Sequence, residues 1–141
     1  MISDRELCEM AVKAMEYAYV PYSHYHVGAA LLLSDGTVYT GCNIENASYT
    51  PTVCAERTAI FKAISEGRRD FVKIAVAGGK DNRVEGVFPP CGVCRQVMAE
   101  FCTENFEILC VKSASPLEYG VFKLPELLPE AFTPAYLSNQ S

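Results

Sequence analysis

Three cysteines in two short segments constrain the fold of this chain more than any other feature. Cys54 stands two residues before Glu56 at the start of a predicted helix, and Cys91 and Cys94 follow Pro90 at the start of another. Cysteines three apart at a helix start can share a metal ion, because both thiols lie on one face. A catalytic zinc ion takes three protein ligands and keeps a fourth position for water. We therefore expect a fold in which two helix N-termini converge, so that their dipoles favour negative charge on the thiolates.

The residues that follow Cys54 indicate catalysis at this site. Glu56 is not a ligand itself, but it could take a proton from the metal's water and pass it to a substrate. Arg57 could donate hydrogen bonds to the thiolates and offset their excess negative charge. Considered alone, Glu56 could equally be a solvated glutamate at a helix start, and Arg57 could pair with a surface carboxylate. A closed structural zinc site, with His24 or His26 as the fourth ligand, is a further alternative.

Length and charge exclude several classes of function. The chain has 141 residues, enough for one domain with its own core. Its apolar runs fall short of the roughly 20 residues that span a membrane, and its N-terminus lacks the pattern of a signal peptide. We therefore expect no membrane partner and a cytoplasmic location. With a net charge of −5 and no basic cluster beyond Arg68 and Arg69, a small neutral molecule is a more suitable partner than a nucleic acid.

Seven cysteines in a chain expected to be cytoplasmic favour metal binding or catalysis over disulfides. Three of them belong to the motif above. The other four lie in apolar stretches, where free thiols behave as small hydrophobic groups. We expect structural positions for these four: Cys8, Cys42, Cys102 and Cys110.

Hydrophobic periodicity predicts helix, hairpin, helix, strand, helix and strand in that order. The pattern assigns helices to about 4–20, 54–66 and 91–101, and strands to 27–33, 38–42, 71–77 and 106–111. From about residue 113, repeated prolines predict a C-terminal tail of loop with one short helix near 126–128. Alternation of helices and strands indicates a single α/β domain over residues 1–141, with a mixed sheet that carries helices on both faces.

Five motifs in the same order resemble the short, homotetrameric cytidine deaminases of the three-cysteine zinc class. They are Pro-Tyr-Ser at 21–23, Val-Gly-Ala-Ala-Leu at 27–31, Gly-Cys-Asn-Ile-Glu-Asn at 41–46, Cys-Ala-Glu-Arg-Thr-Ala at 54–59 and Pro-Cys-Gly-Val-Cys-Arg-Gln at 90–96. The resemblance runs over nearly the whole chain. It implies a three-layer α/β/α sandwich with a mixed, roughly five-stranded sheet, and a homotetramer with sites near the subunit interfaces.

The same resemblance implies the reaction and its cofactor. Cytidine and 2′-deoxycytidine would be hydrolysed to uridine and 2′-deoxyuridine with release of ammonia, as a step of pyrimidine salvage. One Zn²⁺ per subunit would be held by Cys54, Cys91 and Cys94. Glu56 would carry protons between water and the cytosine ring.

Further residues are implied as substrate contacts. Asn43 and Glu45, two apart in an extended segment, point the same way and would hold the ribose hydroxyls. The backbone of Ala55 would contact the base, and Tyr25, where the family often has Phe, would stack on it. Phe132 resembles a C-terminal aromatic residue that reaches a neighbouring subunit's site. Turn chemistry for Asn43, a solvated carboxylate for Glu45 and local packing for Phe132 are the alternatives.

Two other functions stay open at this point. Another zinc deaminase could act on a nucleotide, a polynucleotide or a nucleoside analogue such as an antibiotic. Nucleotide and polynucleotide deaminases resemble a motif that begins with His, whereas this chain has Cys54, and no basic pair for a phosphate lies near 43–45. The alternative that is not an enzyme is a structural zinc-binding module.

Overall fold

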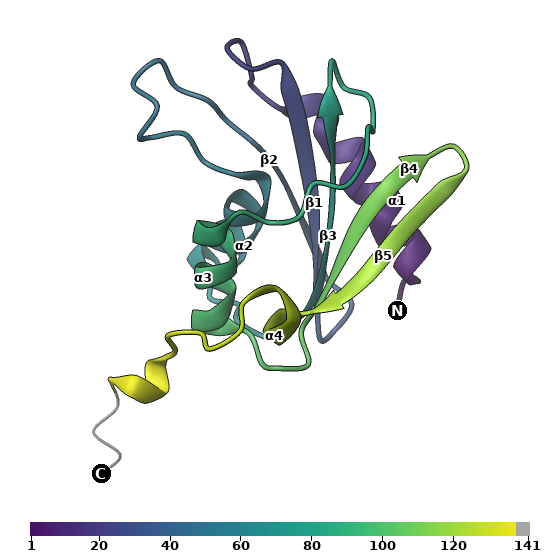
Figure 1. Cartoon of the computed structure of the whole chain (residues 1–141). Helices are drawn as coiled ribbons and strands as arrows, with labels where there is room; N and C mark the ends of the chain where they lie inside the picture. Colours follow the sequence, from purple (N-terminus) through teal and green to yellow (C-terminus); the bar gives the residue numbers. More distant parts are fainter. Residues whose placement is uncertain (138–141) are drawn as a thin grey trace.

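The computed structural model describes residues 1–137, and its centre is a five-stranded mixed sheet (Figure 1). The strands are Tyr25–Leu33 (β1), Val38–Cys42 (β2), Phe71–Lys80 (β3), Glu107–Ala114 (β4) and Leu117–Lys123 (β5). They lie side by side in the order β2-β1-β3-β4-β5. Only β3 and β4 are parallel, and the other neighbouring pairs are antiparallel. The predicted mixed α/β sheet is confirmed.

Helices cover both faces of this sheet, as predicted. They are Asp4–Ala14 (α1), Ala55–Ser65 (α2), Gly92–Phe101 (α3) and Leu124–Leu127 (α4). α1 packs on one face, while α2, α3 and α4 pack on the other (Figure 1). Successive residues of a strand point to opposite faces, so Leu31 enters the core beneath α2 and Leu32 the core beneath α1. Within residues 1–137, no helix has the length and apolar character to cross a membrane.

Local sequence signals account for the first helix. Ser3 Oγ accepts a hydrogen bond from the backbone N–H of Glu6 at 3.1 Å, and the Glu6 carboxylate accepts one from the N–H of Ser3 at 3.0 Å. This is the predicted capping box, in which two N–H groups without helical partners are satisfied. The α-helix ends at Ala14, earlier than predicted, and continues as a 3₁₀ turn over Met15–Tyr17.

The prediction of a loop-rich tail from residue 113 is wrong. Residues 117–123 form β5, which pairs with β4 across a connection at Ser115 and Pro116. β5 is an edge strand with few buried side chains, so its hydrophobic pattern is weak, and the flanking prolines suggested loop instead. The short helix that follows is α4, which begins two residues before the predicted 126–128 segment.

The seven cysteines are all free thiols. Cys8 and Cys110 are buried, as expected for structural positions, and Cys42 and Cys102 are half-buried. Burial raises the pKa of Cys102 to about 12, which keeps this thiol protonated.

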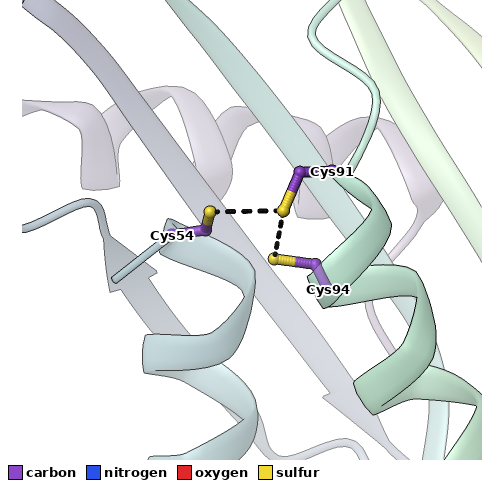
Figure 2. A group of neighbouring side chains, drawn as sticks. All are labelled: Cys54, Cys91 and Cys94. Carbon is purple, nitrogen blue, oxygen red and sulfur yellow. Dashed lines mark hydrogen bonds between the residues drawn. The ribbon is translucent and has the colours of Figure 1, made fainter. Parts of the chain in front are cut away.

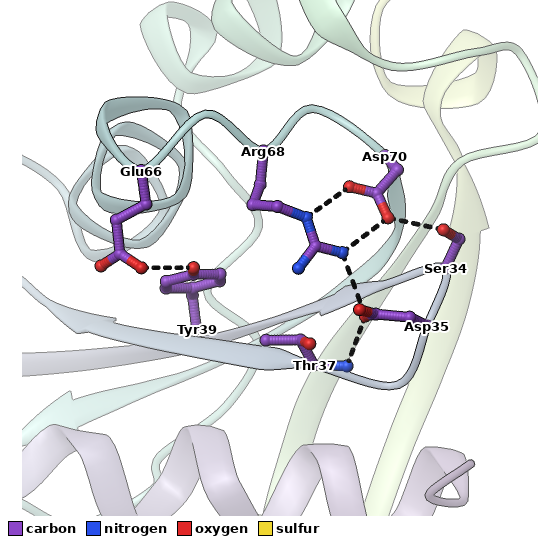
Figure 3. A network of polar contacts seen from close by, with 7 residues as sticks. All are labelled: Ser34, Asp35, Thr37, Tyr39, Glu66, Arg68 and Asp70. Atoms are coloured by element: carbon purple, nitrogen blue, oxygen red, sulfur yellow. Dashed lines mark hydrogen bonds and ion pairs between the residues drawn. The ribbon is translucent and has the colours of Figure 1, made fainter.

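A polar network lies beyond the C-terminal end of α2. Arg68 donates to both carboxylate oxygens of Asp70, at 3.0 and 2.8 Å, and forms an ion pair with Asp35 at 3.0 Å (Figure 3). Ser34 also donates to Asp70. Because one guanidinium contacts both segments, the network ties the turn between β1 and β2 to the loop between α2 and β3.

Candidate metal centre

The three thiols of the sequence motif converge where two helices begin. Cys54 and Cys91 are the N-cap residues of α2 and α3, and Cys94 lies in the first turn of α3. Their sulfur atoms lie within 4.8 Å of one another, with 3.5 Å between Cys54 and Cys91 and 3.5 Å between Cys91 and Cys94 (Figure 2). Cys94 is buried, whereas Cys91 is exposed. One side of the cluster is therefore open.

This geometry fits a single tetrahedral zinc ion. Sulfurs bound to zinc at about 2.3 Å in tetrahedral directions lie about 3.8 Å apart. Among residues 1–137, the three cysteines are the only such group of potential ligands, and neither histidine belongs to it. His26 Nδ1 instead lies 3.1 Å from the carbonyl oxygen of Met15. The described cluster thus offers three candidate ligands and no histidine, which does not favour the closed four-ligand alternative.

The electrostatic surroundings favour a thiolate at Cys54. The hydrogen bond with Cys94 and the Arg57 guanidinium lower the pKa of Cys54 to about 5. Arg57 Nη2 donates to Cys54 Sγ at 3.3 Å, which is the contact proposed from the sequence. The hydrogen bond with Cys54 raises the pKa of Cys94. Because a metal binds the thiolate form of cysteine, the lowered pKa of Cys54 favours binding of a cation by the cluster.

Glu56 lies buried beside this cluster, in the first turn of α2. Only 3% of its surface is exposed, and it is the one charged residue in the described core. Burial raises the pKa of its carboxyl group to about 7. A carboxyl group with a pKa near neutrality can both accept and release a proton, which suits a general acid and base. The alternative of a solvated glutamate is wrong.

Close packing against β2 holds the N-terminal end of α2. A Cβ on Gly41 would lie 2.5 Å from the carbonyl oxygen of Ala55 and 2.6 Å from the backbone nitrogen of Ala59, so only glycine permits this approach. Thr58 Oγ1 donates to the carbonyl of Cys42 at 3.0 Å. The position of the helix start is thus set by backbone contact with the sheet.

A pocket of about 210 Å³ opens beside the thiols. Typical pockets for drug-sized ligands occupy about 300–1,000 Å³, so this one suits a single ring with a small substituent. It is lined by Val27, Asn43, Thr52, Val53, Cys54, Ala55, Glu56, Phe88, Pro89 and Cys91. Sequence reasoning had missed Val27, Thr52, Val53, Phe88 and Pro89. The last two could have been found, because the chain that leads into Cys91 must pass the site.

Asn43 and Glu45 hold the start of β1. Asn43 Oδ1 accepts from the N–H of Val27 at 2.9 Å, and its Nδ2 donates to the carbonyl of Tyr25 at 2.8 Å. Glu45 accepts from the N–H groups of Tyr22 and Ser23, at 3.0 and 3.1 Å, and from the Ser23 hydroxyl. Asn43 also lines the pocket, while Glu45 lines an adjoining hollow, and Thr52 lines both.

The two predicted aromatic residues lie at different distances from the site. The Tyr25 ring lies 5.9 Å from the ring of Phe88, centroid to centroid, and Phe88 lines the pocket. Phe132 instead stacks on Tyr136 with a centroid separation of 5.5 Å, and its carbonyl accepts from Gln96 at 2.8 Å. Within one chain, Phe132 is 56% exposed and does not line the pocket.

The fold and the site together define a class of protein, the zinc-dependent deaminases. An open three-thiol centre, a buried carboxyl group and a ring-sized pocket at helix N-termini form its catalytic arrangement. More narrowly, the chain belongs to the family described as cytidine and deoxycytidylate deaminase zinc-binding region, whose model matches residues 1–110.

Individual relatives agree with this assignment. The chain is 53% identical over 131 residues to a cytidine deaminase of Halalkalibacterium halodurans, covering 92% of this chain and 95% of that one. The crystal structure of cytidine deaminase from Burkholderia pseudomallei has 44% identity and a TM-score of 0.83, covering 93% of this chain and all of the other. Blasticidin-S deaminase of Bacillus cereus is 33% identical over 110 residues, covering 75% and 78% of the two chains. The chain is an enzyme of this family, and the predicted fold class is confirmed.

Proposed function

We propose that this enzyme hydrolyses cytidine and 2′-deoxycytidine to uridine and 2′-deoxyuridine with release of ammonia, a step of pyrimidine salvage. The observation that carries the proposal is the buried Glu56 carboxyl group, which lines the same small pocket as Cys54 and Cys91. The relatives named cytidine deaminase, at 53% and 44% identity, support this choice of substrate.

Zinc would be held by Cys54, Cys91 and Cys94, and when bound it supplies a Lewis acid that makes water nucleophilic at neutral pH. Glu56 takes a proton from the attacking water as the water oxygen adds to C4 of the cytosine ring. The carboxyl group delivers this proton to N3, then takes the second proton from the hydroxyl group now on C4 and delivers it to the amino nitrogen. The C4–N bond then breaks, N3 keeps its proton in the uracil product, and ammonia leaves. Burial of Glu56 excludes bulk water, so the proton moves between defined atoms.

Asn43 and Glu45 keep hydrogen-bonding groups free for a substrate after they have bonded the backbone at the start of β1. An amide side chain has a second lone pair and a second N–H, so Asn43 can bind a ribose hydroxyl without giving up its bonds to β1. The Glu45 carboxylate likewise retains an acceptor site. We infer that both contact the sugar, while Ala55 and Tyr25 contact the base. Arg57 donates a hydrogen bond to Cys54 Sγ and stabilises the thiolate charge.

We further propose a homotetramer in the cytoplasm, with Phe132 completing a neighbouring subunit's site. Several large apolar side chains are exposed in the single chain, and a contiguous apolar surface can mark an interface. They include Tyr17, Tyr19, Tyr49, Val93 and Phe132. Light scattering coupled to size-exclusion chromatography would measure the assembly, and a monomer at working concentrations would contradict it.

The decisive assay follows the ultraviolet absorbance of cytidine and of 2′-deoxycytidine with zinc-loaded protein. Glu56→Gln keeps the side-chain size but cannot transfer the proton, so we expect the rate to fall by about 10²–10⁴-fold at unchanged zinc content. Glu100→Gln, an exposed glutamate on α3, is the matched control and should behave as wild type.

A different substrate is the alternative that the relatives suggest. The 33% identity to Blasticidin-S deaminase makes a nucleoside analogue the second candidate. If the zinc-loaded protein turns over neither cytidine nor 2′-deoxycytidine but does deaminate blasticidin S, the second candidate replaces the first.

A further inference from the structure

One arginine joins the loop that leads into the metal centre to the C-terminal segment of the chain. Arg95 follows Cys94 in α3, and its side chain is half-buried. Its Nε donates to the carbonyl oxygen of Pro90 at 2.6 Å, and its Nη1 donates to the carbonyl oxygen of Leu127 at 2.6 Å. Because a guanidinium is planar and rigid, two short bonds in different directions fix its position.

The first bond fixes the peptide that enters Cys91. Cys91 is the N-cap residue of α3 and is exposed, so burial does not hold its side chain. Its carbonyl oxygen accepts from the backbone N–H of Arg95 at 3.0 Å, which fixes the helix side of the residue and leaves the preceding peptide to be held separately. In the described part of the chain, the bond from Arg95 is the only hydrogen bond to the backbone of 86–90. Rotation of the Pro90–Cys91 peptide would swing the thiol away from the other two sulfurs. The orientation of this ligand therefore depends on Arg95.

The second bond anchors the guanidinium to the core. Leu127 is the last residue of α4, and the last carbonyl groups of a helix have no partner within it. Leu127 and Leu128 pack against the core cluster that contains Cys94. Pro90 is itself buried. Arg95 therefore ties the residue before Cys91 to the end of α4 and holds the two carbonyl groups relative to each other.

The other two thiols have support of their own. Cys94 is buried within the core, and Cys54 accepts a hydrogen bond from Arg57. We propose that Arg95 is a positioning residue of the metal centre, which keeps the exposed Cys91 thiol within reach of the metal. This rests on the proposed zinc site of three cysteines. It adds that the C-terminal segment takes part in metal retention through one side chain.

Arg95→Gln tests the proposal through metal binding rather than through activity. We expect zinc transfer to a chromogenic chelator to become about tenfold to a hundredfold faster, the usual effect of losing a group that orients a ligand. With Co²⁺ in place of zinc, the thiolate charge-transfer absorbance should fall by about one third, because one of three thiolates leaves the metal. Arg95→Lys keeps the charge without the rigid fork and should give an intermediate rate.

Two control variants separate this effect from general loosening. Gln96→Leu removes the neighbouring bond to the Phe132 carbonyl but leaves Pro90 held, and Arg69→Gln removes an exposed arginine. Both should release zinc at the wild-type rate. If Gln96→Leu releases zinc as fast as Arg95→Gln, docking of the C-terminal segment is responsible and the assignment to Arg95 is wrong.

The remaining outcomes are equally decisive. A folded Arg95→Gln protein with the wild-type release rate and cobalt spectrum would overturn the proposal. If circular dichroism shows that Arg95→Gln does not fold, Arg95→Lys decides by the same two measurements. A wild-type protein that takes up neither zinc nor cobalt would refute the metal centre itself, and thus the proposed function as well.

Discussion

The contact between Gly41 and α2 allows the cost of a small displacement at the site to be predicted. Gly41→Ala adds one methyl group on β2, which points at the first two turns of α2. The new Cβ would lie 2.5 Å from the Ala55 carbonyl oxygen, whereas ordinary contacts begin at 3.4 Å. Both opposing atoms, at Ala55 and Ala59, are backbone, so no side-chain rotation can relieve the overlap. The N-terminal end of α2 must therefore move outward by about 0.9 Å.

This displacement acts on residues that the mechanism requires to be fixed. Cys54 and Glu56 lie at the moved end of the helix, one as a proposed metal ligand and the other as the proposed proton carrier. A misplacement of about 1 Å can lower the rate by about 10²-fold. Overpacking of this kind also costs about 1–3 kcal/mol of unfolding free energy. We expect Gly41→Ala to lose about two orders of magnitude in kcat/KM while it remains folded.

Activity against cytidine and urea unfolding should be measured on the same preparations. Gly36→Ala is the matched control: Gly36 has φ +92°, and an added Cβ would have no neighbour within 4 Å. It should cost about 1–2 kcal/mol through backbone strain alone. Its kcat/KM should stay at the wild-type value. If folded Gly41→Ala keeps kcat/KM within about threefold of wild type, α2 can shift without harm and the reasoning is refuted.

Three further predictions concern single side chains. Arg57→Gln removes the donor to Cys54 Sγ, so zinc should transfer to a chelator about tenfold to a hundredfold faster, and an unchanged rate would show that the contact is idle. Tyr25→Phe should change the unfolding free energy by less than about 0.5 kcal/mol and leave kcat/KM unaltered, because the hydroxyl makes no hydrogen bond among the described residues. Hydrogen bonds from the N–H of Thr37 and then from Arg68 lower the pKa of Asp35 from 3.8 to about 2. The ionised carboxylate therefore stabilises the fold at pH values above its unfolded pKa. This contribution is lost as the pH falls through about 2. Asp35→Asn should accordingly unfold at lower urea than wild type at neutral pH, and the difference should vanish in strong acid. A difference that persists there would contradict the carboxylate charge as its source.

Predictions from local signals were the most successful part of the sequence interpretation. The capping box at Ser3 and Glu6 depends on residues three apart, and it forms as expected. The hairpin of β1 and β2, and the start of α3 directly after its N-cap Cys91, follow from short turn and helix signals in the same way. β5 was missed because an edge strand needs little apolar patterning, so the prolines around it dominated the local signal.

The substrate-binding residues show where local reasoning becomes insufficient. The spacing of Asn43 and Glu45 predicted that both contact one sugar; in the structure Asn43 lines the pocket, while Glu45 lines an adjoining hollow. Phe88 lines the pocket and lies beside Tyr25, although the two are far apart in the chain. This contact depends on the path of the segment between β3 and α3, which periodicity does not specify.

The sequence by itself indicated the three candidate metal ligands and the order of helices and strands as far as β4. Ligand chemistry, helix capping and strand alternation depend on residue type and on neighbours a few positions away, so they can be deduced without a fold. Tertiary structure alone decided the burial of Glu56, the close approach of Gly41 to α2 and the two bonds of Arg95. These features join segments that are distant in sequence. Desolvation, backbone contact and ligand orientation exist only once those segments pack together, because water otherwise surrounds each group.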